Sequence, residues 1–397
     1  MKRGTMRVCG VICEYDPFHN GHAHHLRRVR ELSGCEYIVC AMSGYFTQRG
    51  EAALVSKWAR AEMALRCGAD AVFELPTLFA LRDAQRFALG GVALLDGLGV
   101  VTHLGFGSES ADADALRRQA LATPDPDALR AGLACGKAHA RALGEATGQD
   151  AGKPNDTLAV EYLRAMRLLG AAWETVAVPR AGGGHHDGAL SAMASASAVR
   201  RALRQGEDVS RAMPEAAWSL LVRQWEEGAC QRADGLDGAL LACLRRMDAA
   251  EMAQAADIGE GLEHRFARAA WTASGREALL DRVKCKRYTR ARLSRIASQL
   301  LLGLTRSLAL SHPLPDYARL LGFRREARPL LAAISERSRL PLVLRPAKFR
   351  IQHNAAFALD LRAAALWPLG CGAPQLRAGD RELTQKVIIL DETTISD

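Results

Sequence analysis

The feature that most constrains the fold is an alternation of short, β-branched runs with amphipathic stretches over the first half of the chain. Five runs are candidate strands, at residues 6–13, 37–42, 71–75, 100–106 and 175–178. Helix-like stretches such as 56–67 and 83–98 separate them. This order is typical of parallel sheets with right-handed crossovers. We therefore expect an α/β fold with a doubly wound parallel sheet, whose ligands bind beyond the carboxyl ends of the strands.

The second half of the chain has a different pattern. After residue 206 the strand signal fades, and long stretches rich in Ala, Leu and Arg follow at 239–252, 263–283 and 289–307. A chain of 397 residues is long enough for two ordinary domains. We therefore predict an α/β domain over 1–205 and a mainly α-helical, basic domain over 206–397.

Composition narrows the class of protein. Apolar residues make up 49% and charged residues 24%, which predicts a globular protein with a sizeable core. The formal charge of +9 favours polyanionic partners but does not distinguish RNA from DNA or from simple solubility. No apolar run approaches the roughly 20 residues of a membrane span, so we expect a cytoplasmic protein without a membrane partner.

The ten cysteines include no Cys-x-x-Cys pair, and several lie in apolar runs. This pattern is typical of reduced thiols and not of a disulfide framework or a zinc ribbon. Zinc ligation by His22 and His25, or by His185 and His186, lacks a convincing third ligand. We therefore predict no bound structural metal.

The sharpest motif is His19-Asn20-Gly21-His22, between the first candidate strand and a helix-like segment at 23–32. Gly21 lets the backbone approach a ligand, and free N–H groups at a helix start bind phosphate. Protonated or hydrogen-bonding imidazoles of His19 and His22 would stabilise charge on an α-phosphate and a departing pyrophosphate. The alternative is that both histidines only cap and pack the helix.

A second motif, SASAVR at residues 195–200, precedes a short basic helix expected at 198–203. We expect Ser197 to cap that helix, and its N–H groups and Arg200 to face β- and γ-phosphates. Alone, the pattern is an ordinary N-cap. Together with His-x-Gly-His in the same domain, it favours a catalytic site with His19, His22, Ser197 and Arg200.

Further candidate ligand contacts lie in loops of the first half. Gly107 comes after the fourth strand, and Asn155 precedes a helix expected at 157–168, so both are placed to recognise a base or a ribose. Asn155 as a helix cap and Gly107 as a simple turn are the alternatives. The glycine-rich run at 179–187, which includes Arg180, suits closure over an anion or, alternatively, an ordinary surface loop.

The paired motifs resemble those of the nucleotidyltransferase superfamily, and a closer likeness extends over nearly the whole chain. In order, the stretches that resemble the tRNA(Met) cytidine acetate ligase family are EYDPFHNGHAHH, MSGYFTQRGEAALVSKWARAEMAL, FELP, FGSE, KPNDTLAVEYL, SASAVRRAL, EGLEHR, KRYTRARLSR and YARLLGF. The resemblance implies a nucleotidyltransferase domain that forms acetyl-AMP from ATP and acetate. It also implies acetyl transfer to the wobble cytidine of elongator tRNA(Met), giving N4-acetylcytidine.

The resemblance also implies which residues bind ATP. They are Ile12, Cys13, Glu14, Tyr15, Asp16, Pro17, Phe18, His19, Asn20, Gly21, His22, Ala23, His24, His25, Gly107, Asn155 and Arg180. Mg²⁺ is expected with ATP, and no stable protein partner is predicted. Asp16 departs from the asparagine expected of the family, and its carboxylate would repel phosphate unless it is protonated, paired or bound through Mg²⁺.

The strongest basic cluster lies in the second half and surrounds Tyr288. Its predicted tRNA contacts are Lys284, Lys286, Arg287, Arg290, Arg292 and Arg295. Phosphate contacts with stacking by Tyr288 would give RNA affinity that depends on salt. The alternative is a solvated helix face.

Two other functions fit part of this pattern. A small-molecule adenylyltransferase would join AMP to a phosphorylated acceptor, but such enzymes usually lack a large basic helical half. A non-catalytic RNA-binding protein would have lost turnover, although both nucleotide motifs are present.

Overall fold

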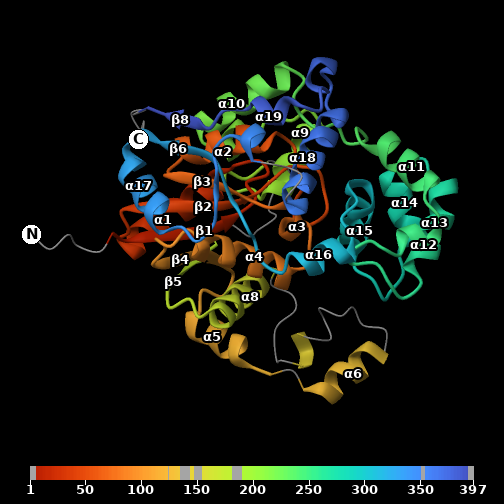
Figure 1. Cartoon of the computed structure of the whole chain (residues 1–397), viewed down its shortest axis with the longest axis horizontal. Helices are drawn as coiled ribbons and strands as arrows, with labels where there is room; N and C mark the ends of the chain where they lie inside the picture. Colours follow the sequence, from red (N-terminus) through yellow and green to blue (C-terminus); the bar gives the residue numbers. More distant parts are fainter. Residues whose placement is uncertain are drawn as a thin grey trace, which may run out of the picture.

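One eight-stranded sheet runs through the molecule and takes strands from both halves of the chain (Figure 1). The computed structural model describes residues 6–123, 125–134, 144–146, 154–180, 190–349 and 354–391. The strands are β1 (Val8–Cys13), β2 (Tyr37–Ser43), β3 (Ala71–Leu75), β4 (His103–Ser108), β5 (Glu174–Pro179), β6 (Ala318–Arg324), β7 (Leu342–Val343) and β8 (Ile388–Leu390). Their order is β5-β4-β1-β2-β3-β6-β7, with β8 also paired to β6.

The first five strands are parallel, as the alternating pattern predicts. Strand β1 pairs with both β2 and β4, so the winding of the sheet reverses between β1 and β4. The α/β, doubly wound fold is confirmed. Strand β6 then adds antiparallel to β3, and β7 and β8 run parallel to β6.

Side chains on the two faces of the sheet form two cores because successive strand residues point to opposite sides. In β2, for example, Ile38, Cys40 and Met42 belong to one core and Val39 and Ala41 to the other, and all are buried. Both faces are therefore covered by helices, which explains the nearly continuous apolar character of the central strands.

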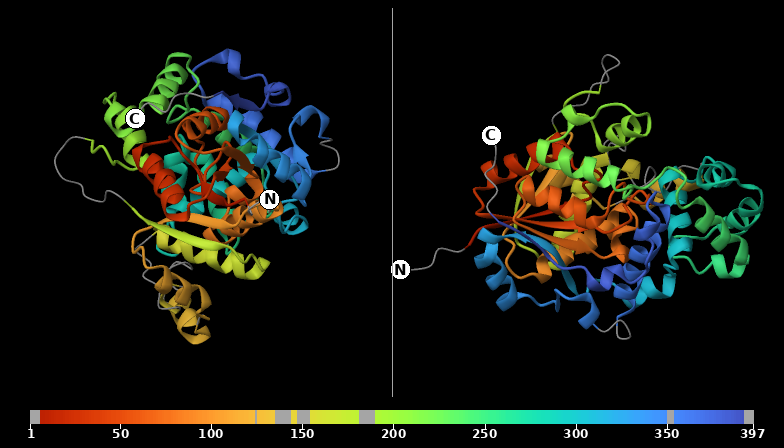
Figure 2. Two further views of the ribbon diagram at one scale, coloured as in Figure 1. Left: turned by 90° about the vertical axis from the view of Figure 1, so that its left-hand side faces the viewer. Right: turned by 90° about the horizontal axis from the view of Figure 1, so that it is seen from above.

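Helices of the first half cover both faces of the sheet (Figures 1 and 2). They are α1 (Asn20–Ser33), α2 (Lys57–Arg66), α3 (Thr77–Ala80), α4 (Ala84–Gly97), α5 (Ala113–Leu121), α6 (Pro126–Ala134), α8 (Pro154–Leu169) and α9 (Ala196–Arg204). Helices α1, α2 and α9 pack into one core, and α4 and α8 pack into the other.

The second half is mainly helical, as predicted, but it also supplies β6, β7 and β8. Its helices are α10 (Glu215–Glu226), α11 (Asp237–Arg246), α12 (Ala249–Met252), α13 (Leu262–Thr272), α14 (Arg276–Val283), α15 (Arg290–Leu302), α16 (Arg306–Ser311), α17 (Arg328–Arg337), α18 (Ala355–Leu366) and α19 (Arg381–Thr384). Strands from both sides of residue 205 share one sheet, and the domain boundary placed there stays a prediction.

Each of the three long stretches predicted as helix in the second half is divided. In the stretch 289–307, helix α15 ends at Gly303, whose φ of +66° is in the left-handed region that terminates helices. The stretch 239–252 divides where Asp248 begins α12 with a capping box. Apolar periodicity continues across such breaks, so the caps and not the periodicity decide where each helix ends.

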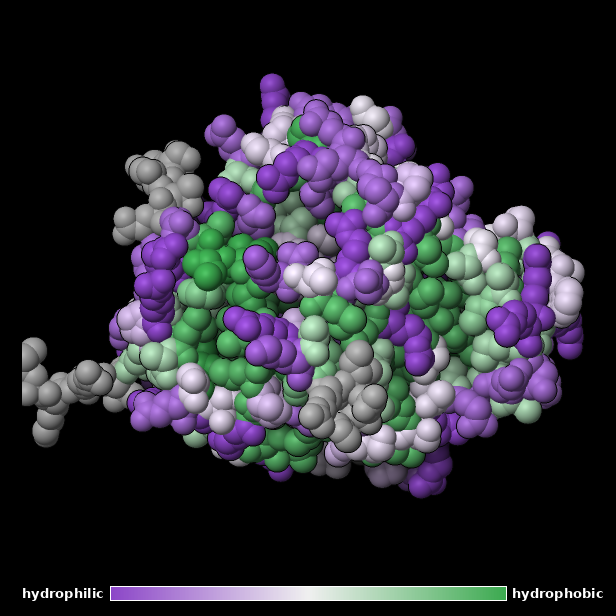
Figure 3. Space-filling model, turned by 45° about the horizontal axis from the view of Figure 1, so that its top comes forward, coloured by the Kyte–Doolittle hydropathy of each residue, from purple (hydrophilic) through white to green (hydrophobic). Residues whose placement is uncertain are grey.

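Hydrophobic and hydrophilic residues are both present on the surface. On the face shown in Figure 3, hydrophobic residues form patches between hydrophilic side chains. Among the helices of the described ranges, none combines the length and the apolar character that crossing a bilayer requires.

Candidate nucleotide site

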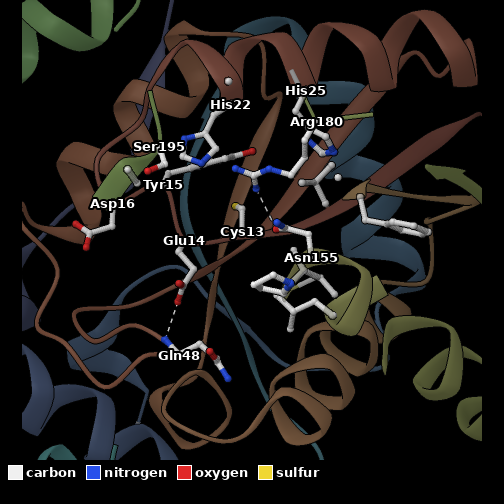
Figure 4. A pocket seen from close by; sticks show the side chains of 18 of the residues that line it. Cys13, Glu14, Tyr15, Asp16, His22, His25, Gln48, Asn155, Arg180 and Ser195 are labelled. Carbon is white, nitrogen blue, oxygen red and sulfur yellow. Dashed lines mark hydrogen bonds between the residues drawn. The ribbon is translucent and has the colours of Figure 1, made fainter. Parts of the chain in front are cut away.

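A cavity of about 560 Å³ lies at the carboxyl ends of β1, β4 and β5 (Figure 4). It lies where the winding of the sheet reverses, between β1 and β4. Helices that follow these two strands cover opposite faces of the sheet and leave a crevice between them. The sequence-based expectation of a site beyond the strand ends agrees with this position.

Most of the stretch from Ile12 to His25 lines the cavity. The lining members are Ile12, Cys13, Glu14, Tyr15, Asp16, His19, Gly21, His22, His24 and His25. The members that do not line it are Pro17, Phe18, Asn20 and Ala23. Phe18 is fully buried, and the Asn20 side-chain amide donates to the carbonyls of Ala192 (2.9 Å) and Arg211 (2.8 Å). These two residues therefore hold the beginning of α1 in place.

Both motif histidines cap α1 and line the cavity. The Nδ1 atom of His19 accepts from the backbone N–H of Gly21 (3.0 Å), and Nδ1 of His22 accepts from the N–H of His19 (3.3 Å). A neutral imidazole that accepts at Nδ1 carries its proton on Nε2. The capping contacts therefore set both rings as Nε2–H donors. Capping and ligand binding, posed as alternatives from the sequence, are compatible in the structure.

The surroundings of the two rings keep them neutral. Burial lowers the pKa of His19 to about 4 and that of His22 well below its ordinary range. Their rings stack with centroids 3.7 Å apart, so two charged rings would repel one another. The sequence left protonated and hydrogen-bonding histidines open, and the structure favours hydrogen bonding in the free protein.

We expect replacement of His19 by Asn to flatten the dependence of stability on pH. Between pH 6.5 and 4 the unfolded chain binds a proton at His19 that the folded chain does not. The stabilisation present above pH 6.5 is therefore lost as the pH falls, by up to about 3 kcal/mol. Asn keeps a capping acceptor but does not titrate.

Urea unfolding of wild type and His19→Asn at pH 7.5 and 4.5 checks this. The loss of unfolding free energy should be smaller in the variant. His264→Asn, at a side chain that is 69% exposed, should follow the wild type. Equal losses in wild type and His19→Asn would contradict the prediction.

The SASAVR segment also lines the cavity, but its cap is not the one predicted. Helix α9 begins at Ala196, and Ser195 is the N-cap, whose hydroxyl accepts from the N–H of Ala198 (3.3 Å). Ser197 lies within the first turn instead, and its predicted capping role is wrong. Ser195, Ala196, Ser197 and Arg200 all line the cavity.

Arg200 explains how a carboxylate is tolerated at position 16. Its guanidinium donates to the carbonyl of Asp16 and lies 3.4 Å from the Asp16 carboxylate. The other oxygen of that carboxylate accepts from the N–H of Leu54 (2.7 Å). Asp16 is therefore paired, one of the conditions under which its charge is compatible with a phosphate site.

The opposite side of the cavity is built from β4, β5 and α8. Asn155, in the first turn of α8, accepts from Arg180 (3.0 Å) through its side-chain oxygen, as Figure 4 shows. Its side-chain nitrogen donates to Glu109, whose second oxygen accepts from the N–H of Asp156 (2.9 Å). Gly107 lines the cavity next to these residues. Glu109 therefore caps α8 and orients Asn155, which in turn holds Arg180.

Sequence reasoning missed two parts of the cavity. One is an apolar wall of Phe87, Leu158 and Tyr162, next to Phe106 at the end of the fourth strand, where base or ribose recognition was predicted. The other is Gln48, whose N–H donates to Glu14 (2.7 Å) from a loop after β2. In the sequence, the stretch that contains Gln48 indicates only the family likeness. The three helical residues of this wall gave no signal, because an apolar residue on a helix face usually belongs to the core.

Some predictions lie beyond what the structure describes. Residues 181–189, most of the predicted glycine loop, are outside the described ranges. All nine cysteines within those ranges are free.

The predicted tRNA cluster lies around α14 and α15, and many of its charges are paired. Arg290 pairs with Glu277 and Asp281, and Arg287 and Arg292 lie near Glu260. Two expectations change because of burial. Arg295 is 9% exposed and cannot reach RNA in this structure, and Tyr288 is 4% exposed and cannot stack on a base. Contacts by the other five cations stay a prediction.

Comparison with known proteins agrees with this geometry. A sequence model of the HIGH nucleotidyl transferase family matches residues 6–381. The fold and the site therefore define a nucleotidyltransferase that carries the histidine motif at the end of its first strand.

Individual relatives identify the family within this class of nucleotidyltransferases. The tRNA(Met) cytidine acetate ligase of Syntrophotalea carbinolica is 41% identical over 358 residues, which cover 85% of this chain and 84% of the relative. That of Fervidobacterium nodosum is 36% identical, with 87% and 85% covered. The crystal structure of Thermotoga maritima TmcAL bound with alpha-thio ATP has a TM-score of 0.89 at 32% identity and covers 98% of this chain and all of that one. The chain belongs to the tRNA(Met) cytidine acetate ligase family, as its motifs predicted.

Proposed function

We propose that this protein activates acetate with ATP and transfers the acetyl group to the wobble cytidine of elongator tRNA(Met), in the cytoplasm. The observation that carries the proposal is the convergence of both nucleotide motifs and the Asn155–Arg180 pair on one cavity, in a chain of this family. The product is N4-acetylcytidine, with AMP and pyrophosphate released.

The first step is attack on the α-phosphate of ATP by an acetate oxygen. A bond forms between that oxygen and phosphorus, the bond to the β-phosphate bridge breaks, and pyrophosphate leaves. The protein supplies position and charge stabilisation, and no covalent nucleophile is needed. The Nε2–H groups of His19 and His22 are the donors for the phosphate oxygens, because the backbone N–H groups of His19 and Gly21 donate to the two imidazoles.

The remaining groups divide between the two ends of ATP. Ser195, Ser197 and the beginning of α9 receive the β- and γ-phosphates, next to Arg200. The apolar wall with Phe87 and Phe106 receives the adenine ring, and Asn155 and Arg180 contact the nucleotide from the β4–β5 side.

Mg²⁺ fits this site only as an ion carried by ATP. Among the described residues, no group of three or more His, Cys, Asp or Glu side chains is placed to hold a metal. Mg²⁺ commonly keeps several waters and binds through substrate phosphates with one or two carboxylates. Asp16 and Glu14 are the carboxylates that line the cavity. Bound Mg²⁺ would neutralise phosphate charge.

The second step is attack of the cytidine amine on the acetyl carbon. The carbon–nitrogen bond forms, the bond to the AMP oxygen breaks, AMP leaves with the electron pair, and the amine loses a proton. An anticodon-loop base is unpaired and can be turned out into a pocket. Because the cytidine enters only at this second step, the first step can be measured without RNA.

Acetate-dependent exchange of labelled pyrophosphate into ATP, without tRNA, tests the first step. Mass analysis of nucleosides after bulk tRNA is added tests the second. Exchange together with acetylated cytidine is the expected result. Absence of exchange with any small carboxylate, even with tRNA present, would contradict the acyl-adenylate mechanism, and release of a stable dinucleotide would identify a small-molecule adenylyltransferase.

The exposed part of the basic cluster is proposed to bind tRNA phosphates. Lys286 and Arg287 are exposed in the loop between α14 and α15. Replacing both with Ala should weaken tRNA binding and reduce the slope of log affinity against log salt by roughly 2. Pyrophosphate exchange should not change, because neither residue lines the cavity.

Filter binding at several salt concentrations measures the effect. Arg328→Ala with Arg337→Ala is the matched control, because both are exposed on α17, which lies on the opposite side of the molecule from α14 in Figure 1. An unchanged affinity and slope in the Lys286 and Arg287 variant would place the tRNA surface elsewhere.

A further inference from the structure

A small hairpin after β2 forms part of the cavity wall. The N–H of Thr47 donates to the carbonyl of Glu51 (2.9 Å), and the N–H of Gly50 donates to that of Thr47 (2.9 Å). Phe46 and Ala52 form an antiparallel bridge below this turn. Thr47, Gln48 and Arg49 at its tip all line the cavity. The hairpin is thus a defined element of the site and not a loose loop.

The helical second half fixes the hairpin from behind. The carbonyl of Gly50 accepts from Ser298 (2.7 Å) and from Arg276, and the carbonyl of Gln48 accepts from Arg295 (3.3 Å). Gly50 has φ +82°, and a Cβ there would lie 2.3 Å from the backbone nitrogen of Arg295. Only glycine allows this approach, so α15 packs directly against the tip.

The front of the hairpin connects to both nucleotide motifs. The N–H of Gln48 donates to Glu14 at the end of β1 (2.7 Å; Figure 4), and Glu51 pairs with Arg200 of α9 (3.0 Å). The hairpin therefore extends from the first strand to the segment that receives the outer phosphates. The hairpin is thus held by Glu14 and Arg200 on the side of the cavity and by α15 on the other side.

Arg49 differs from the other arginines that line the cavity. Arg200 pairs with Glu51 and lies near Asp16, and Arg180 donates to Asn155. Arg49 is exposed, and it has no hydrogen bond or ion pair with any residue in the described ranges. Arg49 is therefore a cation on a fixed hairpin, and no carboxylate in the described ranges pairs with it.

We propose that Arg49 binds the β- and γ-phosphates of ATP and the pyrophosphate that leaves. This rests on the proposed function and adds a substrate-binding residue to it. The outer phosphates are the most highly charged part of ATP, and a guanidinium binds phosphate oxygens in a two-pronged geometry. The hairpin holds this cation on the side of the cavity where Glu51 meets Arg200.

Binding and exchange by Arg49→Ala and Arg49→Lys test the inference. In Arg49→Ala the Kd for ATP should rise about 10-fold and pyrophosphate exchange should fall about 10- to 100-fold, since a charge-assisted phosphate contact is lost. The Kd for AMP should stay within about 2-fold, because AMP lacks the outer phosphates. Arg49→Lys should restore part of the ATP affinity, because the charge remains but the two-pronged geometry does not.

Arg204→Ala is the matched control, because Arg204 is an exposed arginine of α9 that does not line the cavity. It should match the wild type in every measurement, and the melting temperature of Arg49→Ala should also be unchanged. Equal weakening of ATP and AMP binding, or exchange at the wild-type rate with weaker tRNA binding, would overturn the inference. A wild-type protein without exchange would instead contradict the proposed function.

Discussion

Replacing His22 with Ala is expected to lower acetate-dependent pyrophosphate exchange by at least ~10²- to 10³-fold, the usual effect of removing one preorganised donor from a charged transition state. The Nε2–H group of His22 lies at the cavity, and its tautomer is set because Nδ1 accepts from the N–H of His19. Exchange assays with purified variant measure the loss. tRNA binding should remain near normal, because the predicted RNA surface lies in the other half of the chain.

Two further variants separate catalysis from helix capping. His22→Asn retains an acceptor for the N–H of His19 but has no group at the position of Nε2. His22→Gln can place an amide N–H near that position. We therefore expect His22→Asn to fold and remain inactive and His22→Gln to recover part of the exchange. Full exchange in His22→Asn would assign the residue to capping alone, and loss of tRNA binding in all three variants would indicate a folding role.

Replacing Lys57 with Met is expected to destabilise the protein by roughly 3–5 kcal/mol, the typical effect of removing one partner from a buried ion pair. The Lys57 ammonium is fully buried, 2.7 Å from both oxygens of Glu74 and 2.6 Å from Glu382. Arg319 is the second cation of this cluster and lies 2.8 Å from Glu382. Without Lys57, two buried carboxylates share one cation.

Urea unfolding measures this loss of free energy. The control is Arg28→Ala, which breaks an ion pair with Glu31 whose side chains are 40% and 48% exposed, and it should cost under about 1 kcal/mol. A similar small cost for Lys57→Met would mean that the cluster adds little to stability. Lowered pyrophosphate exchange at full stability would link Lys57 to catalysis instead, although it does not line the cavity.

The buried cluster also shows why the second half was only partly predicted. Arg319 lies in β6, which pairs with β3 and thereby joins the second half to the sheet. Residues 318–324 contain two arginines and a glycine, so their strand character is weak in the sequence. Burial of the Arg319 charge becomes favourable only beside Glu74 and Glu382, which are distant in the chain.

The cavity was predicted in outline because each of its two motifs can be recognised from a few consecutive residues. His-x-Gly-His follows an apolar run and opens a helix, and SASAVR precedes one, so both identify strand and helix ends. The cap at α9 was misplaced by two residues, because Ser195 and Ser197 are equally good caps. The choice between them depends on how the preceding chain packs.

The sequence by itself therefore determined the alternating α/β order, the strand ends that carry the site and the family likeness. These depend on residue periodicity and on motifs within a few positions of one another. Only the tertiary structure decided that Arg200 pairs with Asp16, that Glu109 orients Asn155 and that the Arg49 hairpin rests on α15. Each of these contacts joins segments that are far apart in the chain, which periodicity and short motifs do not report. For Asp16 the physical reason is burial, because a buried charge is stable only where another segment supplies its partner.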